Sequence, residues 1–418
     1  MLKFYGVIFI ILLSFLSLRF YQFYSGLTVY EVGQEVKLEH TFLNEPRLTG
    51  FNQTFYVENL KIYVQRFPEY HYGDTITLSG EVEEQEYVSK KNGQVITEIV
   101  IKNPKIETRD NDNFILAVGQ VFRQKIVDLF DSTLPPVSSS LLMGIVFGIK
   151  KDMPYSFFED LRNAGVLHVI AASGMNVALV GGFISGLLGS LLKRQTAILL
   201  SMFAILFYAF LSGFEPSIVR ASIMGILAFS AQILGRQNLS LLSLFLAGYG
   251  MLLVSPKLLF DIGFQLSFVS TLGLIYIPRA MLTDSFRERV KKTLVGDDIT
   301  TTISAQLATL PILLANFGTY SLWSVAVNGV LLWVVPVIMV LGGVGAVVGM
   351  VVEPLGKLFL YLSFPFLMYF EKVVVFFGDF EGVSVTNFPW TFAVGYYCIL
   401  ISLLIYIGRR RHVKNVEE

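Results

Sequence analysis

Three side chains that can hydrogen-bond or move a proton lie within nine residues at the head of a long apolar run. They are His168, Ser173 and Asn176 in the stretch HVIAASGMNV, and the run continues to Leu192. Charged side chains cost about 2.5–3.5 kcal/mol at the centre of a bilayer, so polar groups there face protein or water. We therefore predict that these three side chains line a polar path. His168 and Asn176 are eight residues apart, about two turns, and share one face if the helix is continuous.

The dipeptide Ser173-Gly174 allows two interpretations of this run. Small residues permit close contact between two helices. The pair can equally interrupt the helix and leave backbone groups facing a water-filled cavity, where non-helical backbone is tolerated. The sequence leaves both interpretations open.

Catalysis centred on His168 is the least favoured interpretation. The stretch AASGM does not match the G-x-S-x-G pattern, and no carboxylate nearby would orient the histidine. The chain has one cysteine, Cys398, which excludes an intrachain disulfide. No H-x-H-x-D-H cluster is formed by its four histidines, His40, His71, His168 and His412. We expect no catalytic residue, no metal site and no cofactor.

Further polar side chains lie inside the apolar segments and are candidates for the same lining: Arg220, Gln232, Gln265, Gln306, Asn316 and Asn328. The amides can also simply bridge helices, at under about 2 kcal/mol for each hydrogen bond. Arg220 stays charged and is harder to explain in this way. It either pairs with Glu215 at an outer rim or offers a fixed positive charge to an anion in a pore.

These residues must be positioned by membrane helices, because the composition is that of a polytopic membrane protein. The 418 residues are 54% hydrophobic and 15% charged, with a net charge of zero, where a soluble protein has about a quarter charged residues. Ten apolar segments are candidate spans of a bilayer about 30 Å thick, and 299–317 is the most polar of them. They cover residues 4–24, 166–192, 196–214, 217–235, 239–254, 258–283, 299–317, 321–352, 355–378 and 391–408. Pro336 and the glycines from 342 to 349 predict a kink or a split in 321–352.

The uneven spread of hydrophobicity divides the chain into five parts. We expect an uncleaved anchor helix at 1–27, a β domain at 28–112, amphipathic or interfacial helices at 113–160, a transmembrane domain at 161–408 and a basic tail at 409–418. Four basic segments lie on the same side of the membrane if all ten segments span it: Lys193-Arg194, Arg236, the run 279–292 and the tail. By the positive-inside rule this side is cytoplasmic. Both termini are then inside and the β domain is outside.

The segment 28–112 alternates apolar and polar residues with the period of strands. About five short strands suit a small all-β barrel of the OB type, and a sandwich fragment fits almost as well. The segment holds nine Lys or Arg and fifteen Asp or Glu, a net charge of −6, which disfavours general phosphate binding. A local basic patch is a possible DNA contact, formed by Lys61, Arg66, Lys90 and Lys91.

Several motifs resemble the competence domain of the ComEC family, bacterial DNA-uptake channels of the cytoplasmic membrane. The stretch GVLHVIAASGMNVALV looks like the family signature G-L-x-H-L-L-A-[IV]-S-G-L-H-V. Three further stretches match the same domain in the same order: SIVRASIMG, SPKLLFDIGFQLSFVSTLGLI and SAQLATLPILLANFGTYSLWSVAVNGVLLWVVP. The β segment is similar to the family's N-terminal OB-like domain. The resemblance implies uptake of single-stranded DNA during natural competence, with a separate nuclease, a DNA receptor and a cytoplasmic helicase-like motor as partners.

Two departures from the family pattern qualify this expectation. The second histidine of the signature is Asn176 here, and an amide donates and accepts hydrogen bonds but does not titrate. Full-length relatives also carry a C-terminal metallo-β-lactamase-like domain, so the nuclease is expected to be absent or on another chain. Two alternatives to the DNA channel stay open: a transporter of a smaller anionic or amphipathic solute, and a membrane-embedded enzyme centred on His168. The sequence does not determine the oligomeric state.

Overall fold

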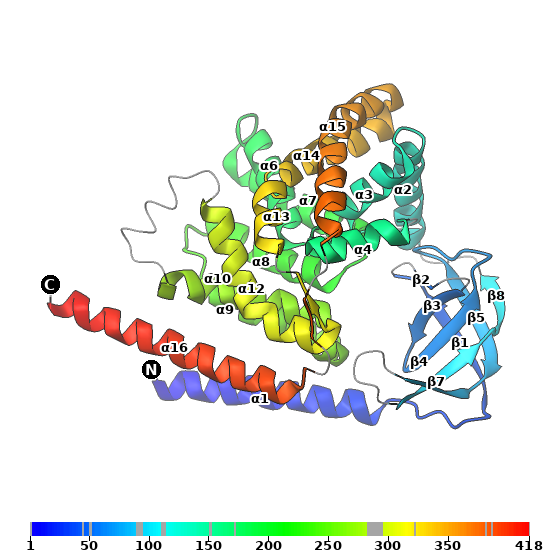
Figure 1. The fold of residues 1–418 in the computed structure, drawn as a ribbon, viewed down its shortest axis with the longest axis horizontal. Coiled ribbons are helices and arrows are strands. Elements are labelled where there is room, and N and C mark those ends of the chain that lie inside the picture. Colours follow the sequence, from blue (N-terminus) through cyan, green and yellow to red (C-terminus); the bar gives the residue numbers. More distant parts are fainter. Residues whose placement is uncertain are drawn as a thin grey trace. The chain divides into compact units, whose positions relative to one another are not determined.

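The structure is a computed structural model that describes residues 2–417 except 44–45, 50–51, 89–94, 110–113, 150–152, 171–172, 282–295, 322, 381–382 and 386–387. The chain divides into two compact units (Figure 1). The first contains Met1–Ile126 and Tyr249–Lys257, and the second contains Val127–Gly248 and Leu258–Glu418.

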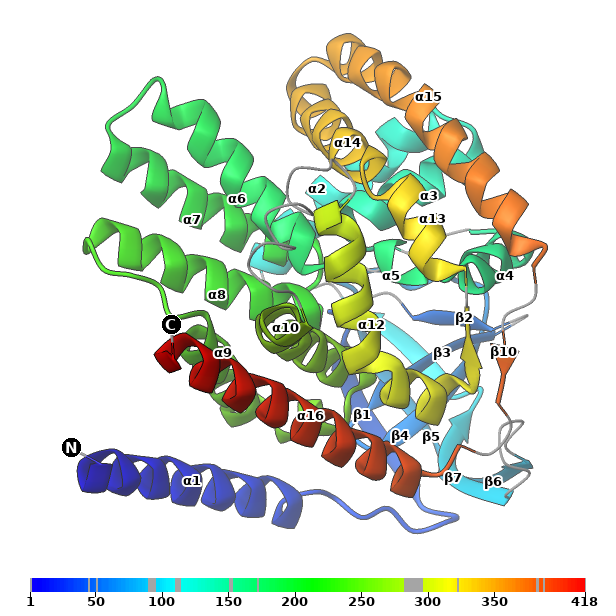
Figure 2. The same ribbon diagram turned by 60° about the vertical axis from the view of Figure 1, so that its left-hand side comes forward.

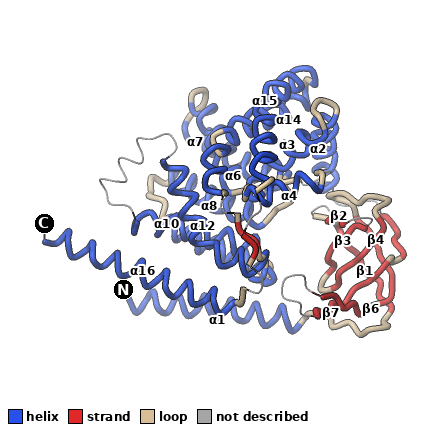
Figure 3. The backbone as a smooth tube through the Cα atoms, viewed as in Figure 1, coloured by secondary structure: helices blue, strands red, loops and turns tan. Residues whose placement is uncertain are grey.

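Eight strands form the β part of the first unit (Figure 3). One antiparallel sheet has the order β1-β5-β8, and a second has the order β2-β3-β4-β7-β6 with β4 and β7 parallel. The strands are β1 (Glu35–Thr41), β2 (Arg47–Thr49), β3 (Asn52–Val57), β4 (Leu60–Gln65), β5 (Thr75–Glu81), β6 (Glu83–Val88), β7 (Val95–Lys102) and β8 (Lys105–Arg109). The sequence predicted about five strands in a closed barrel. The described strands instead pair as two sheets, and their pairing does not show closure.

The core of this β part follows from the period-two alternation of its strands. In β4, residues 60, 62 and 64 are buried and alternate with half-buried or exposed ones. Phe42, Phe55, Ile62, Ile76 and Leu78 belong to one buried cluster, to which both sheets contribute. Tyr30 and Tyr70 belong to the same core, whereas Tyr56 and Phe67 are exposed.

The first unit also contains two apolar helices that run in parallel, α1 (Leu2–Ser25) and the end of α9 (Ser240–Val254). The Tyr249 hydroxyl donates to the Leu12 carbonyl at 3.2 Å, and Arg19 Nε donates to the Leu253 carbonyl at 2.9 Å. Arg19 thus satisfies a carbonyl in the last turn of α9, which has no partner within its own helix. Just after α9, Lys257 Nζ donates to the Glu58 carbonyl at 2.6 Å, in the turn between β3 and β4.

The second unit is helical (Figure 2). Its helices are α3 (Pro136–Phe147), α4 (Tyr155–Ala164), α5 (Leu167–Ile170), α6 (Gly174–Gly189), α7 (Arg194–Leu211), α8 (Pro216–Ile233), η1 (Pro256–Phe260), α10 (Ile262–Met281), α12 (Gly296–Phe317), α13 (Ser324–Leu331), α14 (Val334–Val351), α15 (Glu353–Gly378) and α16 (Trp390–Glu417). Helix α2 (Phe114–Asp131) and helix α9 contribute to both units, and β9 (Thr319–Tyr320) pairs with β10 (Val383–Ser384).

Six described helices are long and apolar enough to cross a bilayer, which makes this a multi-pass membrane protein. They lie at Gly6–Ser25, Arg194–Leu211, Pro216–Ile233, Val334–Val351, Glu353–Gly378 and Trp390–Ile407. Four shorter apolar helices are Pro136–Phe147, Gly174–Gly189, Ser240–Val254 and Ile262–Pro278. The ten spans expected from the sequence coincide with helices, but by length and hydropathy six of the described helices qualify.

The split expected in 321–352 occurs at Leu332 and Trp333, between α13 and α14. Both residues keep right-handed helical dihedral angles. Because Pro336 has no N–H, the carbonyl four residues earlier, at Leu332, loses its helical partner. The proline therefore accounts for the break, and the glycines have another role. In α14, Gly349 lies against Gly356 of α15, where a Cβ on Gly356 would come within 2.3 Å of the Gly349 Cα.

Candidate functional site

The helix carrying the HVIAASGMNV motif is interrupted, as one of the two interpretations of Ser173-Gly174 predicts. Helix α5 ends at Ile170 and α6 begins at Gly174, with Ser173 extended at φ −112° and ψ 170°. His168 and Asn176 therefore do not share the face of one continuous helix. Ser173 occupies the N-cap position, but its hydroxyl donates to Asn176 Oδ1 at 3.2 Å and does not accept from the first turn.

His168 lies in the short helix α5, where its side chain is exposed and its neighbours Val169 and Ile170 are buried. The polar lining role of His168 stays a prediction.

Asn176 is buried in a hydrogen-bonded network. Its Nδ2 donates to the Ile145 carbonyl at 2.7 Å and to the Tyr208 hydroxyl at 3.3 Å. The Tyr208 hydroxyl in turn donates to the Val146 carbonyl at 2.7 Å. Ile145 and Val146 lie in the last turn of α3, where carbonyl groups have no partner within the helix. Asn176 and Tyr208 therefore cap the buried end of α3.

Arg220 of α8 is 8% exposed and has no carboxylate within ion-pair distance in the described part of the chain. Its Nη1 donates to the Thr271 hydroxyl and lies 3.8 Å from the Met224 sulfur. The guanidinium carbon is 6.0 Å from the centre of the Phe268 ring, and Nε has no hydrogen-bond partner. The alternative of a salt bridge to Glu215 is therefore not the arrangement of Arg220 in this structure.

The guanidinium of Arg220 lines a cavity of about 580 Å³ formed by α6, α7, α8 and α10. One wall is made of glycines: Gly174, Gly181, Gly182 and Gly225. The apolar lining includes Met175, Met224 and Phe229, and the polar lining is Arg220, Gln232, Ser270 and Thr271. A volume of this size is typical of small-ligand sites. Of the sequence-predicted site residues, Gly174, Arg220 and Gln232 line this cavity.

Among the other candidate amides, only Gln306 makes a described hydrogen bond between two α-helices. Gln306 Nε2 donates to the Ser324 hydroxyl at 2.6 Å, which joins α12 to α13. Asn316 donates to the Ile312 carbonyl one turn earlier in its own helix, and Gln265 donates to the Leu259 carbonyl. Asn328 is buried, and its Oδ1 has no hydrogen-bond partner.

In the β part, the described members of the expected basic patch are paired with acids. Lys61 Nζ lies 2.9 Å from Glu98 Oε2 and within 6.0 Å of the centres of the Tyr56 and Tyr63 rings. Burial acts to lower the pKa of Lys61, but hydrogen bonds to Glu98 and Tyr63 outweigh it, so the pKa is raised. Lys90 and Lys91 lie outside the described residues.

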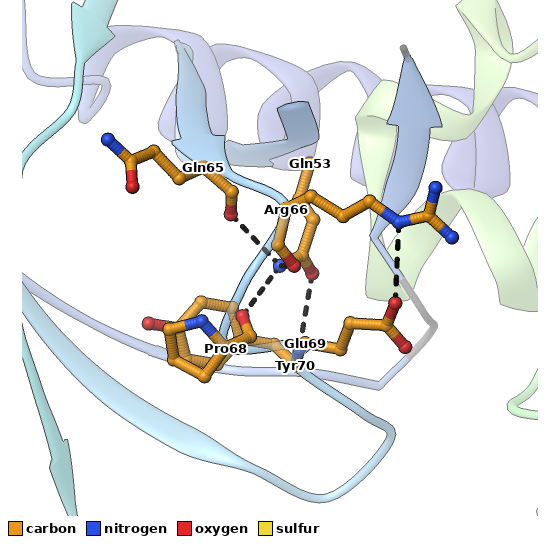
Figure 4. Close-up of polar contacts among 6 residues, drawn as sticks. All are labelled: Gln53, Gln65, Arg66, Pro68, Glu69 and Tyr70. Carbon is orange, nitrogen blue, oxygen red and sulfur yellow. Dashed lines mark hydrogen bonds and ion pairs between the residues drawn. The ribbon is translucent and has the colours of Figure 1, made fainter. Parts of the chain in front are cut away.

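The second described member, Arg66, lies in a loop organised by a buried glutamine (Figure 4). Arg66 Nε is 3.5 Å from Glu69 Oε1. Gln53 Nε2 donates to the carbonyls of Gln65, Arg66 and Pro68, at 3.2, 2.7 and 2.7 Å, while its Oε1 accepts from the Tyr70 N–H at 3.1 Å. The loop that presents Arg66 is thus fixed from inside.

The described residues contain no group of three or more His, Cys, Asp or Glu side chains that could hold a metal ion. What they present instead is one buried guanidinium without a counter-ion, on the wall of a largely apolar cavity. This arrangement can attract an anion.

Residues 145–410, which include this cavity, match the family model described as "Competence protein". The chain belongs to the competence protein family. It is 31% identical to ComE operon protein 3 of Bacillus subtilis (strain 168) over 208 residues, 49% of this chain and 26% of that protein. An uncharacterized protein of Aquifex aeolicus (strain VF5) is 28% identical over 189 residues, 45% of this chain and 43% of that protein. The matches thus span less than half the length of these relatives. No solved structure matches the chain.

Within the competence domain, sequence reasoning missed Tyr208, Thr271 and the tyrosine pair Tyr396 and Tyr397. The pair donates to the carbonyls of Leu307 and Ala308 on α12, at 2.8 and 2.9 Å. A signal for this was present, because Pro311 deprives the Leu307 carbonyl of its helical donor. No sequence pattern indicated which side chain would replace that donor.

Proposed function

We propose that this chain passes single-stranded DNA across the cytoplasmic membrane of a bacterium during natural competence. Membership of the competence protein family supports a role in DNA uptake. The observation that carries the proposal is Arg220, a buried positive charge without a carboxylate partner that faces a cavity in the matched region. Burying an unpaired charge is costly, and a passing phosphate would compensate that cost during transport.

The proposed orientation places both termini in the cytoplasm and the β part outside. The parallel contacts of α1 with α9 support it, since ten spans in the expected order give these two helices the same direction. After replacement of Cys398 by serine, a membrane-impermeant maleimide added outside should label a cysteine at Glu86 and spare one at Lys193. The reverse pattern would overturn the orientation and the direction of transport.

Reconstitution in liposomes tests the function. Labelled single strands should enter vesicles containing the protein more readily than duplexes of equal length, because a bundle of about ten helices leaves little room for B-form DNA. Arg220→Gln should reduce entry, and Arg236→Gln, the same change at an exposed arginine, should not. Equal entry of both forms of DNA, or entry of neither, would contradict the proposal.

His168 is proposed as a polar member of the lining and not as a proton carrier. His168→Gln should then keep much of the DNA entry, because the amide keeps a donor and an acceptor. His168→Leu should lose it. Loss in both variants would favour proton transfer and revive the enzyme hypothesis.

We further propose that the chain hydrolyses no strand itself and works with a separate nuclease, a DNA receptor and a cytoplasmic helicase-like motor. Incubation of the purified protein with labelled strands and Mg²⁺, Mn²⁺ or Zn²⁺ should leave them intact. Metal-dependent cleavage would contradict it.

The second candidate is a transporter for a smaller anionic or amphipathic solute. The cavity favours it in one respect, because about 580 Å³ suits a single small ligand. Uptake of a mononucleotide, but of no longer strand, in the same vesicles would select this candidate.

A further inference from the structure

Two positive features meet at one end of the cavity. The first is the guanidinium of Arg220, and the second is the N-terminus of α6. A Cβ placed on Gly174, the first residue of α6, would lie 3.0 Å from Arg220 Nη2. The first-turn amides of a helix and its dipole favour an anion.

In the described part of the chain, no acidic side chain pairs with the Arg220 guanidinium or with the N-terminus of α6. The Ser173 hydroxyl donates to Asn176 Oδ1 and caps no amide of the first turn of α6. The Asn176 N–H donates to the Ser173 carbonyl at 3.1 Å, so the first-turn amides offered to an anion are those of Gly174 and Met175. Arg220 is more than nine-tenths buried, its Nε has no partner, and its contacts are with a hydroxyl, a sulfur and an aromatic face. Packing alone would not select a guanidinium here, since an apolar side chain would avoid the cost of desolvation.

The rest of the cavity suits an apolar, flat group attached to the anion. Met175, Met224 and Phe229 line it, and a Cβ on Gly182 would meet no atom within 4 Å. Thioether and aromatic side chains are favourable partners for a nucleobase or another flat ring.

We propose that this cavity is a binding site for one nucleotide unit. Its phosphate ester would lie on Arg220 and the N-terminus of α6, and its base against the methionines and Phe229. Thr271 orients the guanidinium, because its hydroxyl accepts from Arg220 Nη1 and donates to the Ser267 carbonyl. The inference deepens the proposed function, because such a site would hold one unit of a passing strand. The same phosphate chemistry is offered by lipid headgroups, so the test includes both sources.

The test measures binding to the full chain in a zwitterionic detergent by isothermal titration calorimetry. The probes are thymidine 5′-monophosphate, thymidine, inorganic phosphate and dihexanoylphosphatidylglycerol. Thymidine 5′-monophosphate should bind about tenfold or more tightly than thymidine, since hydrogen bonds to charged groups are the strong ones. Comparable binding of thymidine, or binding of the lipid without the nucleotide, would overturn the assignment.

Three variants locate the phosphate. Arg220→Gln should weaken nucleotide binding by about tenfold or more, and Arg220→Lys should weaken it less, because a point charge remains without the fork. Thr271→Val removes the acceptor that orients Arg220 Nη1 and should weaken nucleotide binding by about two- to tenfold. Arg236→Gln is the matched control and should bind as the wild type does. If Arg220→Gln fails to fold, Thr271→Val becomes the deciding variant. An unchanged affinity of Thr271→Val for thymidine 5′-monophosphate would then contradict the proposal.

Parallel translocation assays separate this site from the proposed function. Nucleotide binding that depends on Arg220, without passage of any strand, would support the nucleotide site and contradict the proposed channel function. Passage of single strands with no binding of thymidine 5′-monophosphate would support the channel function and contradict the nucleotide site.

Discussion

Asn176 and Tyr208 are joined by a hydrogen bond of 3.3 Å and together cap the end of α3, through the carbonyls of Ile145 and Val146. Asn176 occupies the position of a histidine in the ComEC signature. An imidazole N–H can make the same bond to a carbonyl, so this position requires a donor rather than a titrating group or a metal ligand.

Asn176→His should therefore keep the stability of the wild type more closely than Asn176→Leu does. Leucine leaves the Ile145 carbonyl without its donor in the core, at a cost of about 1–3 kcal/mol. Thermal unfolding in detergent measures the difference. Asn316→Leu, which removes only a bond within its own helix, is the control and should cost less. Equal loss in the histidine and leucine variants would show that the shape of the amide matters more than its donor.

Tyr396→Phe should destabilise the contact between α16 and α12. The Leu307 carbonyl has lost its helical donor to Pro311 and receives the Tyr396 hydroxyl instead. Removing that donor leaves a polar group unsatisfied, at about 1–3 kcal/mol. Tyr406→Phe, on the exposed face of the same helix, should have little effect on the melting temperature. Similar shifts in both variants would contradict this role of Tyr396.

Gln53→Ala should loosen the loop from Gln65 to Tyr70. It removes the donor shared by three carbonyls and the acceptor of the Tyr70 N–H. Hydrogen–deuterium exchange should increase in this loop, with an expected loss of about 1–3 kcal/mol or more. Gln65→Ala removes an exposed side chain but keeps its carbonyl, so the exchange of the loop should stay as in the wild type. Unchanged exchange in Gln53→Ala would show that the loop is held by other contacts.

Acid should weaken the β part through His40. Burial holds the pKa of His40 below its usual value, and the ring stacks on Phe55 at 5.6 Å. The unfolded chain then binds a proton more readily than the folded chain, so this contribution to stability is present above about pH 6.5 and is lost as the pH falls toward the folded pKa. His40→Phe should reduce the acid sensitivity of hydrogen exchange in β1 and β5, after correction for intrinsic rates. An unaltered pH profile would exclude His40 as its source.

The positions of the helices could be predicted from the periodicity and hydropathy of the sequence. All ten apolar segments contain helices, because length and apolar composition act locally, but 166–192 and 321–352 are each divided between two helices. Pro336 marked a real break because the missing N–H of a proline has the same effect in any helix. Arg220 stood out because a charge in an apolar run needs a reason.

Pairing across long distances in the chain could not be predicted. Thr271 lies 51 residues from Arg220, and Tyr208 lies 62 residues from Val146. The arrangement of eight strands in two sheets depends on parallel pairing of β4 with β7, which alternation alone does not specify. The glycines of α14 gave a signal for flexibility, but Gly349 serves close contact with Gly356.

The bond between Arg19 and Leu253 has a consequence for biogenesis, because its two partners are 234 residues apart in the chain. At about 5–20 residues per second, a ribosome needs roughly 10–50 s to make the second partner after the first. During that interval α1 must remain in the bilayer with Arg19 lacking the carbonyl that it later binds. An insertase or chaperone that shields the first helix would therefore act early, and its task would end when the last turn of α9 has emerged.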